Sequence, residues 1–437
     1  MLIPNLDWES KSDRKEFDDI LQKYSFDSFH SAKYAIEAQS FYEDLSLRGD
    51  AAIVEYLRKY SHSEYTEDTI CVDPNKILEA KHKLNDKVIK AFSRAIENIT
   101  KYQKHIMPTE ITPVDIHGGK LGLRHNPVDS VGLAVPGGSG SYPSSVIMLA
   151  VPAQVAGVNS LCVATPPRML TSRKSPLEVD STVLGICGLL GIDRVYRIGG
   201  LALMALSLGT DKIEKVHMIA GPSNIYGQQA KRQIFGFSGI DGLYGPSEIV
   251  IFADDTANHD WIASDLIAQA EHNPGKAILF STYEHVIQSV YESIKKMIPE
   301  RKRYAEIKQV LKERCALVQI PKMEVGVDLI NRIAPEHLTL ALKDYNNVLK
   351  EIRHAGAIFL GDRSPVASGD YWAGPSHCLP TGGTAKFTSG CSVYTFLKRT
   401  SIEYYPSGLS AQAIEDIQLM ANVEGFEGHA NSIKLRK

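Results

Sequence analysis

Two polar side chains near the end of a predicted helix could hold a metal ion. Residues 245–274 begin with Gly-Pro and then SEIVIFA (247–253), a β-branched and apolar run that predicts a buried strand. WIASDLIAQAEH follows with helical periodicity, and Asn258 or Asp260 can cap it. Gln269 and His272 are three residues apart, so their side chains share one face near the negative end of the helix dipole. We interpret them as half of a metal site, although such pairs are usually solvated.

The other polar candidates lie far away along the chain. Glu336 and His337 are adjacent and precede the apolar run LTLAL, so a carboxylate and an imidazole at a strand entry could share proton transfer. Asp370 and His377 lie in a long Gly-, Ser-, Thr- and Pro-rich stretch after residue 361, and loops of that length are usually disordered or functional. Oxygen and nitrogen donors of this kind suit zinc or a similar divalent ion. The full candidate set is Gln269, His272, Glu336, His337, Asp370, His377, Glu424 and His429.

The composition is that of a globular chain with several domains. It has 437 residues, 43% of them hydrophobic, and a net charge of −3 without a basic block, so we expect no nucleic-acid partner. The polar N-terminus lacks the apolar core of a signal peptide, and no later stretch reaches ~18 uninterrupted apolar residues, so we expect no membrane partner. Six scattered cysteines without a CxxC argue against a disulfide scaffold or a thiolate zinc site and predict a cytoplasmic location.

The elements that must position these residues follow two α/β alternations. Residues 1 to 106 show helical periodicity, and residues 107–128 predict a small hairpin. From residue 130, SVGLAV, SLCVAT, RVYRIGG and KVHMIAG alternate with helical segments, and from residue 247 a second set of strands does the same. We therefore predict an α/β fold with two Rossmann-like, doubly wound parallel-sheet domains, a helical N-terminal region and a C-terminal extension.

Two loops of the first alternation could bind a phosphate-bearing cofactor. Ligands of parallel sheets bind at the carboxyl ends of the strands. There the chain has VPGGSGSYPSS (135–145), which leads into a helix, and AGPSN (220–224), in which Asn224 can donate a hydrogen bond. The first is not the spaced GxGxxG fingerprint, and a plain tight loop explains it about as well.

Taken together, the motifs resemble the histidinol dehydrogenase family from about residue 40 to the C-terminus. The matching text is RGDAAIVEYLRKYS, VPGG, PAQVAGV, AGPSN, AKRQIFG, GIDGLYGPSEIVIFAD, ASDLIAQAEHNP, APEHL, AGAIFLG, SGDYWAGPSHCLPTGGTA and EGFEGHANSI. The resemblance implies a zinc-dependent four-electron oxidation of L-histidinol to L-histidine through histidinal, with two NAD, in histidine biosynthesis.

The resemblance also assigns roles to residues of this sequence. It implies that Glu336 and His337 are the catalytic acid/base pair. The implied metal ligands are Gln269, His272, Asp370 and His429. The implied substrate-binding residues are Ser247, Gln269, His272, His337, Asp370, His377, Glu424 and His429. The cofactor positions are Asn224, Ala134 and Ala202. In the family the residue that matches His429 comes from the partner subunit, which implies a homodimer with a shared active site. The resemblance also implies that His377 and Glu424 contact the substrate across the dimer.

The implied domains are an N-terminal extension (1–30), a discontinuous first α/β domain with the metal and acid/base residues (31–134 plus 248–390), an inserted nucleotide-binding domain (135–247) and a C-terminal extension (391–437) that serves the partner's active site.

The sequence departs from the family pattern around the cofactor. Ala134 and Ala202 stand where the family often has Tyr and Gln, both of which touch the cofactor. This chain also has GPSN where the family has GPGN. Gly242 and Tyr244 also change the loop before the strand at 247. These departures keep three alternatives open: an enzyme for another polar primary alcohol such as a sulfonated diol, a catalytically dead zinc-binding relative, and, with least weight, a hydrolase that uses Glu336 and zinc-bound water.

Overall fold

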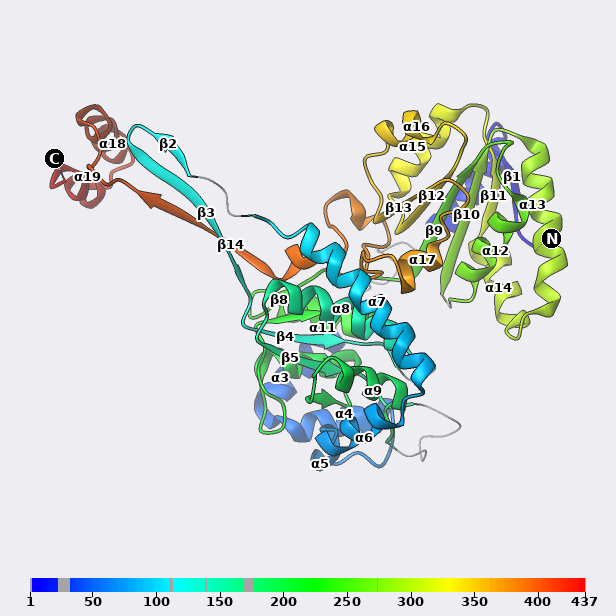
Figure 1. The fold of residues 1–437 in the computed structure, drawn as a ribbon, viewed down its shortest axis with the longest axis horizontal. Helices are drawn as coiled ribbons and strands as arrows, with labels where there is room; N and C mark the ends of the chain where they lie inside the picture. The colour runs from blue at the N-terminus through cyan, green and yellow to red at the C-terminus, as the bar shows by residue number, and fades with distance from the viewer. Residues whose placement is uncertain are drawn as a thin grey trace.

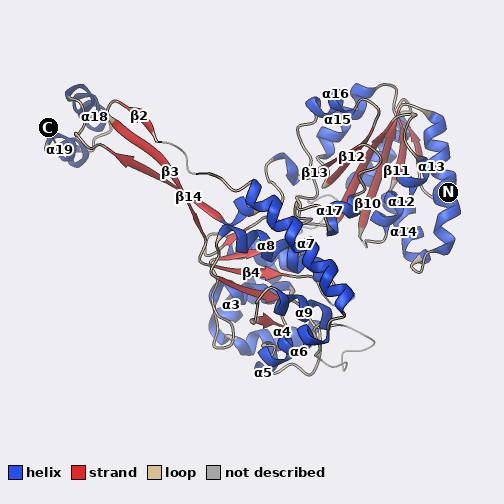
Figure 2. Cartoon of the chain, viewed as in Figure 1, coloured by secondary structure: helices blue, strands red, loops and turns tan. Residues whose placement is uncertain are grey.

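Two parallel sheets and one antiparallel ribbon organise the chain (Figures 1 and 2). The computed structural model describes residues 2–22, 32–109, 113–137, 140–168, 177–272 and 274–436. Across these ranges no helix is both long and apolar enough to cross a membrane.

The first sheet has five parallel strands in the order β6-β5-β4-β7-β8. Its strands are β4 (Ser130–Ala134), β5 (Ser160–Ala164), β6 (Val195–Tyr196), β7 (Met218–Ala220) and β8 (Gly239–Ile240). Numbered along the chain, the order is 3-2-1-4-5, which is the doubly wound arrangement. Side chains alternate between the faces: Leu133 packs in one apolar cluster and Ala134 in the other.

Helices cover both faces of this sheet. On the Leu133 face, α6, α7, α8 and α9 bury residues in the first apolar cluster. On the Ala134 face, α3, α4 and α11 bury residues in the second. The bounds are α3 (Ala32–Arg48), α4 (Asp50–Tyr60), α5 (Glu67–Ile70), α6 (Pro74–Lys83), α7 (Asp86–His105), α8 (Pro143–Ala156), α9 (Ser181–Leu189), η1 (Gly200–Met204), α10 (Ala205–Leu208) and α11 (Ile225–Ile234).

The second sheet repeats the same topology with one strand added. Its order is β1-β11-β10-β9-β12-β13, and all neighbours are parallel. The strands are β9 (Ser247–Ala253), β10 (Gly275–Ser281), β11 (Ala316–Gln319), β12 (His337–Ala341), β13 (Ala357–Leu360) and the added β1 (Asn5–Asp7). The helices are α1 (Lys11–Gln22), α12 (His259–Ala270), α13 (Glu284–Met297), η2 (Ile298–Glu300), α14 (Tyr304–Arg314), α15 (Met323–Ile333), α16 (Tyr345–Glu351) and α17 (Val366–Tyr371).

The predicted fold class is confirmed, but the strand pairing divides the chain differently from the predicted domains. The sequence predicts that 31–134 belongs with 248–390. Instead β4 pairs with β5 and β7, and α3 and α4 pack on that same sheet. The helices bury their apolar stripes on the nearest sheet, so 32–105 and 130–134 go with 135–240. The predicted N-terminal extension is also part of a domain, because β1 pairs with β11.

The C-terminal residues form an arm that leaves the body of the molecule (Figure 1). β2 (Val114–Ile116), β3 (Gly119–Pro127) and β14 (Leu397–Tyr404) pair as an antiparallel ribbon, so the predicted hairpin is real but gains a third strand from the other end of the chain. The short η3 (Thr384–Lys386) and η4 (Val393–Phe396) precede β14, and α18 (Ala411–Val423) and α19 (Glu427–Lys434) follow it at the tip of the arm.

Phe17 on α1 fixes the N-terminal segment to the second sheet. Its side chain is fully buried, and its ring lies 5.4 Å from that of Trp8 and 5.9 Å from that of Phe280 on β10. We predict that Phe17→Ala lowers the free energy of unfolding by about 3–5 kcal/mol, because it removes a large side chain from a closed core. Urea unfolding checks this, with exposed Leu47→Ala as the control. Equal stability of the two variants would contradict it.

Candidate functional site

One cavity lies where the two sheets face each other end to end. Its volume is about 460 Å³, within the range of small-ligand sites. On one wall are the loops that follow β4, β6 and β7, which are the carboxyl ends of the five-stranded sheet. On the other wall Ser247 and His337 begin β9 and β12, so these are the amino ends of the six-stranded sheet. The cavity thus joins the predicted cofactor loops to the predicted acid/base pair.

A chain of hydrogen bonds holds Glu336. The Ser247 hydroxyl donates to Glu336 Oε2 at 2.7 Å, and the backbone N–H of Glu248 donates to the same oxygen at 2.8 Å. Gln269 donates through Nε2 to the Ser247 hydroxyl at 2.9 Å. The carboxamide oxygen of Gln269 is therefore turned away from Ser247, and Glu336 keeps Oε1 available for another partner.

The His337 ring has one tautomer that fits its surroundings. Nδ1 lies 3.2 Å from the carbonyl oxygen of Glu248, which can only accept, so Nδ1 carries the proton. Nε2 is buried without a hydrogen bond among the described residues, and it lies 3.7 Å from Asp370 Oδ1. A neutral imidazole with a free Nε2 lone pair beside a cavity is arranged as a base.

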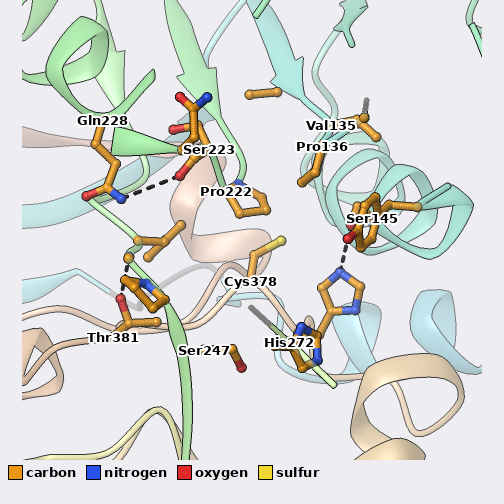
Figure 3. Close-up of a pocket in the computed structure, with 18 of the residues that line it drawn as sticks. Val135, Pro136, Ser145, Pro222, Ser223, Gln228, Ser247, His272, Cys378 and Thr381 are labelled. Atoms are coloured by element: carbon orange, nitrogen blue, oxygen red, sulfur yellow. Dashed lines mark hydrogen bonds between the residues drawn. The ribbon is translucent and has the colours of Figure 1, made fainter. Parts of the chain in front are cut away.

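Asp370, on α17, and His377, in the segment after it, line the same cavity as His337. His377 Nδ1 is 2.9 Å from the Asp370 carbonyl oxygen, and its Nε2 is 3.1 Å from the Ser145 hydroxyl on α8 (Figure 3). Ser145 belongs to the domain built on the five-stranded sheet, so this contact joins the two domains across the cavity. We did not single out Ser145 from the sequence, since a serine in the loop VPGGSGSYPSS has no distinguishing signal.

Loss of hydration shifts the pKa values of the ionisable groups around the cavity. Loss of hydration raises the pKa of Glu336 to about 8 and that of Asp370 to about 6. The same cause lowers the pKa of His337, and lowers that of His377 to about 4. The pKa of His272 is lowered as well, by desolvation first and then by the neighbouring His337 and Arg303. Clusters of shifted groups in a cleft are typical of active sites.

The predicted metal ligands are brought together only in part. His272 and Asp370 line the cavity, and Gln269 touches Ser247 at its edge. His429 and Glu424, by contrast, lie at the tip of the arm, far from the cavity of their own chain (Figure 1). Within the described ranges no three His, Cys, Asp or Glu side chains form a group that could hold a metal ion. One protomer alone therefore offers a carboxamide oxygen, an imidazole and a carboxylate, a donor set that fits zinc but is incomplete.

The three predicted cofactor positions differ in their access to the cavity. Asn224 lines it and caps α11, since its Oδ1 accepts from the Gly227 N–H at 3.0 Å. Ala134 also lines it, at the end of β4. Ala202 is fully buried in η1 and does not line the cavity, because its methyl packs in the apolar cluster beneath the sheet.

Two buried ion pairs near the cavity could not be predicted from the sequence. Glu248 binds Lys276 at 2.8 Å and accepts the backbone N–H of Gly382 at 2.9 Å, and it also presents its own N–H to Glu336. Such pairs join residues that lie far apart in the sequence, and a single lysine or glutamate in a strand gives no signal of its partner.

The second buried pair shapes the loop that carries Asn224. Lys231 Nζ lies 2.5 Å from Asp241 Oδ1, with both side chains almost without exposed area. It also donates to the Gly221 carbonyl at 2.5 Å, and Asp241 Oδ2 accepts the Gly221 N–H at 2.6 Å. Gly221 has φ +117, and an added Cβ would lie 2.2 Å from the Ala134 carbonyl oxygen, so only glycine fits there.

The departures at 242 and 244 are sterically linked. The Tyr244 ring is buried beside the cavity, and a Cβ on Gly242 would lie 2.9 Å from that ring. Tyr244 also donates from its hydroxyl to the Asp241 carbonyl at 3.2 Å and faces Lys231, whose Nζ is 5.1 Å from the ring centroid. The large residue at 244 thus requires the small one at 242.

The two doubly wound domains share one cavity. In it, cofactor-type loops lie opposite a buried carboxylate–imidazole pair, an arrangement that suits an oxidoreductase. The chain belongs to that class: it is an oxidoreductase.

Comparison with known proteins identifies the family. The family model described as histidinol dehydrogenase matches residues 27–437. The histidinol dehydrogenase of Rhodopirellula baltica is 38% identical over 90% of this chain and 85% of its own length, and that of Prochlorococcus marinus is 36% identical over 99% and 98%. The crystal structure of the histidinol dehydrogenase from Elizabethkingia anophelis has a TM-score of 0.89, with 29% identity over 100% of this chain and 98% of that one. The chain therefore belongs to the histidinol dehydrogenase family.

Lys231 offers a test of the buried pair. We predict that Lys231→Met lowers the free energy of unfolding by about 3–5 kcal/mol, because it leaves Asp241 buried without a counter-charge. The double variant Lys231→Met/Asp241→Asn should recover most of that loss, since no unpaired charge remains. Chemical denaturation of the three proteins measures both effects. A double variant no more stable than the single one would contradict this account.

Proposed function

We propose that the protein oxidises L-histidinol to L-histidine through histidinal, with zinc and two NAD, as part of histidine biosynthesis. The single observation that carries the proposal is the free Nε2 of His337, which sits beside Glu336 and Asp370 and opens on the same cavity as the cofactor-type loops. An alcohol placed between the two walls would have a base at its hydroxyl and a hydride acceptor at its carbon.

His337 serves as the base of both oxidations in this proposal. Its Nε2 would take the hydroxyl proton of the substrate, and a bound NAD would supply the hydride acceptor. The Glu248 carbonyl, which accepts from Nδ1, holds the ring in the required tautomer and stabilises the imidazolium that forms. The low pKa of this buried ring helps it to release the proton before the next step.

Glu336 acts between the two oxidations. Its Oε2 is fixed by Ser247 and by the Glu248 N–H, so Oε1 can take a proton from the water that adds to the aldehyde. A carboxyl group whose pKa is raised to about 8 can both accept and release a proton near neutral pH. The overall balance is alcohol, two NAD⁺ and water to carboxylate, two NADH and three protons.

Gln269, His272 and Asp370 are the residues that would hold zinc. A zinc ion bound there would supply a Lewis acid that fixes the imidazole and amine of histidinol. Because one protomer offers an incomplete donor set, we propose that the partner's His429 supplies the fourth ligand and that Glu424 also reaches the partner's substrate.

The surface of the arm supports a homodimer. The tip of the arm exposes a group of large apolar side chains, more than a solvated helix pair needs. They are Leu419, Met420, Val423, Phe426 and Leu435, each more than half exposed. A second copy of the chain that covers this tip would bring α19 to the cavity of its partner.

Tyr244 favours a second candidate substrate. The cavity wall at 244 is changed from the family pattern by a buried phenol, so another polar primary alcohol, such as a sulfonated diol, could replace histidinol while the acid/base residues keep their roles. A substrate screen with zinc-loaded protein and both nicotinamide cofactors distinguishes the two.

The base assignment predicts a large loss of turnover in His337→Asn. We expect kcat for L-histidinol oxidation to fall by about 10²–10⁴-fold with little change in KM, because the amide cannot take the proton. NADH absorbance with L-histidinol and NAD measures it. The proposed function fails if the wild-type protein forms no NADH from any alcohol, as a dead relative would.

The ligand assignment predicts that His272→Asn loses zinc while the fold is kept. Metal content per protomer after gel filtration, with circular dichroism as the fold check, measures this. His285→Asn is the matched control, because His285 lies exposed in the first turn of α13 and should retain zinc at the wild-type level. Full zinc occupancy in His272→Asn would show that the assignment is wrong.

A further inference from the structure

Two buried polar atoms on the α11 side of the cavity are not used by the proposed reaction. The Ser223 hydroxyl and Gln228 Oε1 have no hydrogen-bond partner in the part of the chain that the structure describes. Both residues line the cavity, and Gln228 is only 3% exposed. Figure 3 shows the Gln228 side chain beside Ser223, on the wall opposite His272. A buried acceptor without a partner destabilises the unliganded protein, so a ligand that donates to it binds more tightly.

The orientation of the Gln228 amide is set by its backbone neighbour. Its Nε2 donates to the Ser223 carbonyl at 3.4 Å. The opposite orientation would place two oxygens against each other, so Oε1 is the atom left for a ligand. The wall therefore presents one fixed acceptor, Gln228 Oε1, together with the Ser223 hydroxyl, which can donate or accept.

Gly227 makes room for the Ser223 side chain. The motif is GPSN here and GPGN in the family. A Cβ on Gly227 would lie 2.5 Å from Ser223 Cβ and 2.7 Å from its Oγ. The serine is therefore accommodated because residue 227 is glycine, and the two residues act as a matched pair.

Gln228 also lies close to the reacting end of the cavity. A Cβ on Gly245 would be 4.0 Å from Gln228 Nε2 and 3.1 Å from Thr381 Oγ1. Gly245 is two residues before Ser247, whose hydroxyl is bonded to Glu336. The Gln228 side chain thus lies between the α11 N-terminus and the segment that leads to Ser247.

We propose that Ser223 and Gln228 form a hydrogen-bonding subsite for the nicotinamide half of the dinucleotide. The group they bind carries an N–H or O–H donor, which describes both the carboxamide and the ribose hydroxyls. A phosphate is excluded as the partner of Gln228 Oε1, because two acceptors would repel each other. The subsite supplies polar contacts in a chain that has Ala134 and Ala202 where the family often has Tyr and Gln. This inference rests on the proposed use of NAD.

Direct binding of NADH tests the subsite separately from catalysis. Isothermal titration calorimetry compares wild type, Gln228→Met and Ser223→Gly, and we expect the dissociation constant to rise about tenfold in each variant. Gln233→Met is the matched control, since Gln233 lies on the same helix, bonds Gln39 at 2.6 Å and does not line the cavity. Ser223→Gly restores the family residue, so it remains informative if Gln228→Met folds poorly.

A nicotinamide analogue identifies the bound group. In 3-acetylpyridine adenine dinucleotide a methyl replaces the amide NH₂. If Gln228 accepts from the carboxamide, wild type discriminates against the analogue and Gln228→Met does not. If it accepts from the ribose, Gln228→Met weakens both ligands equally. NADH binding by Gln228→Met and Ser223→Gly as tight as that of Gln233→Met would overturn the subsite, whereas a wild type that binds no NADH would overturn the proposed function itself.

Discussion

The burial of two carboxylates, Glu336 and Glu248, is the constraint on which the rest of the site depends. A buried carboxylate is tolerated only with charge or hydrogen-bond partners. Glu248 takes Lys276 from the neighbouring strand and the N–H of Gly382 from the segment after α17. Glu336 takes Ser247 and the Glu248 backbone, and the Glu248 carbonyl orients His337. The need to satisfy these two groups therefore fixes the residues around the proposed base.

The end-to-end arrangement of the two sheets explains why the Glu336–His337 pair lies opposite the cofactor-type loops. Both sheets have the 3-2-1-4-5 order, yet one uses its carboxyl ends and the other its amino ends. Contacts that cross the cavity, such as His377 with Ser145 and Gly245 with Thr381, join the walls. The arm carries α19 away from this cavity.

Two of the departures from the family pattern, Tyr244 and Ser223, each lie against a glycine. Tyr244 fills the space over Gly242, and Ser223 fills the space beside Gly227. In both pairs a larger residue is accommodated by a glycine, so packing is preserved while the polar character of the cavity wall changes. The residues that surround Glu336 and His337 are not part of either pair. Changes of this kind alter the cavity wall and leave the surroundings of Glu336 and His337 unchanged.

The sequence by itself determined the α/β class, the alternation of strands and helices, and the family, because periodicity and motif order are local properties. It also placed Glu336 and His337 at a strand entry. Only the tertiary structure decided that β4 joins the helices before it, that β1 completes the second sheet, and that Lys231 and Glu248 lie in buried ion pairs. These depend on contacts between residues far apart in the chain, and a single sequence carries no signal for which distant partners will meet.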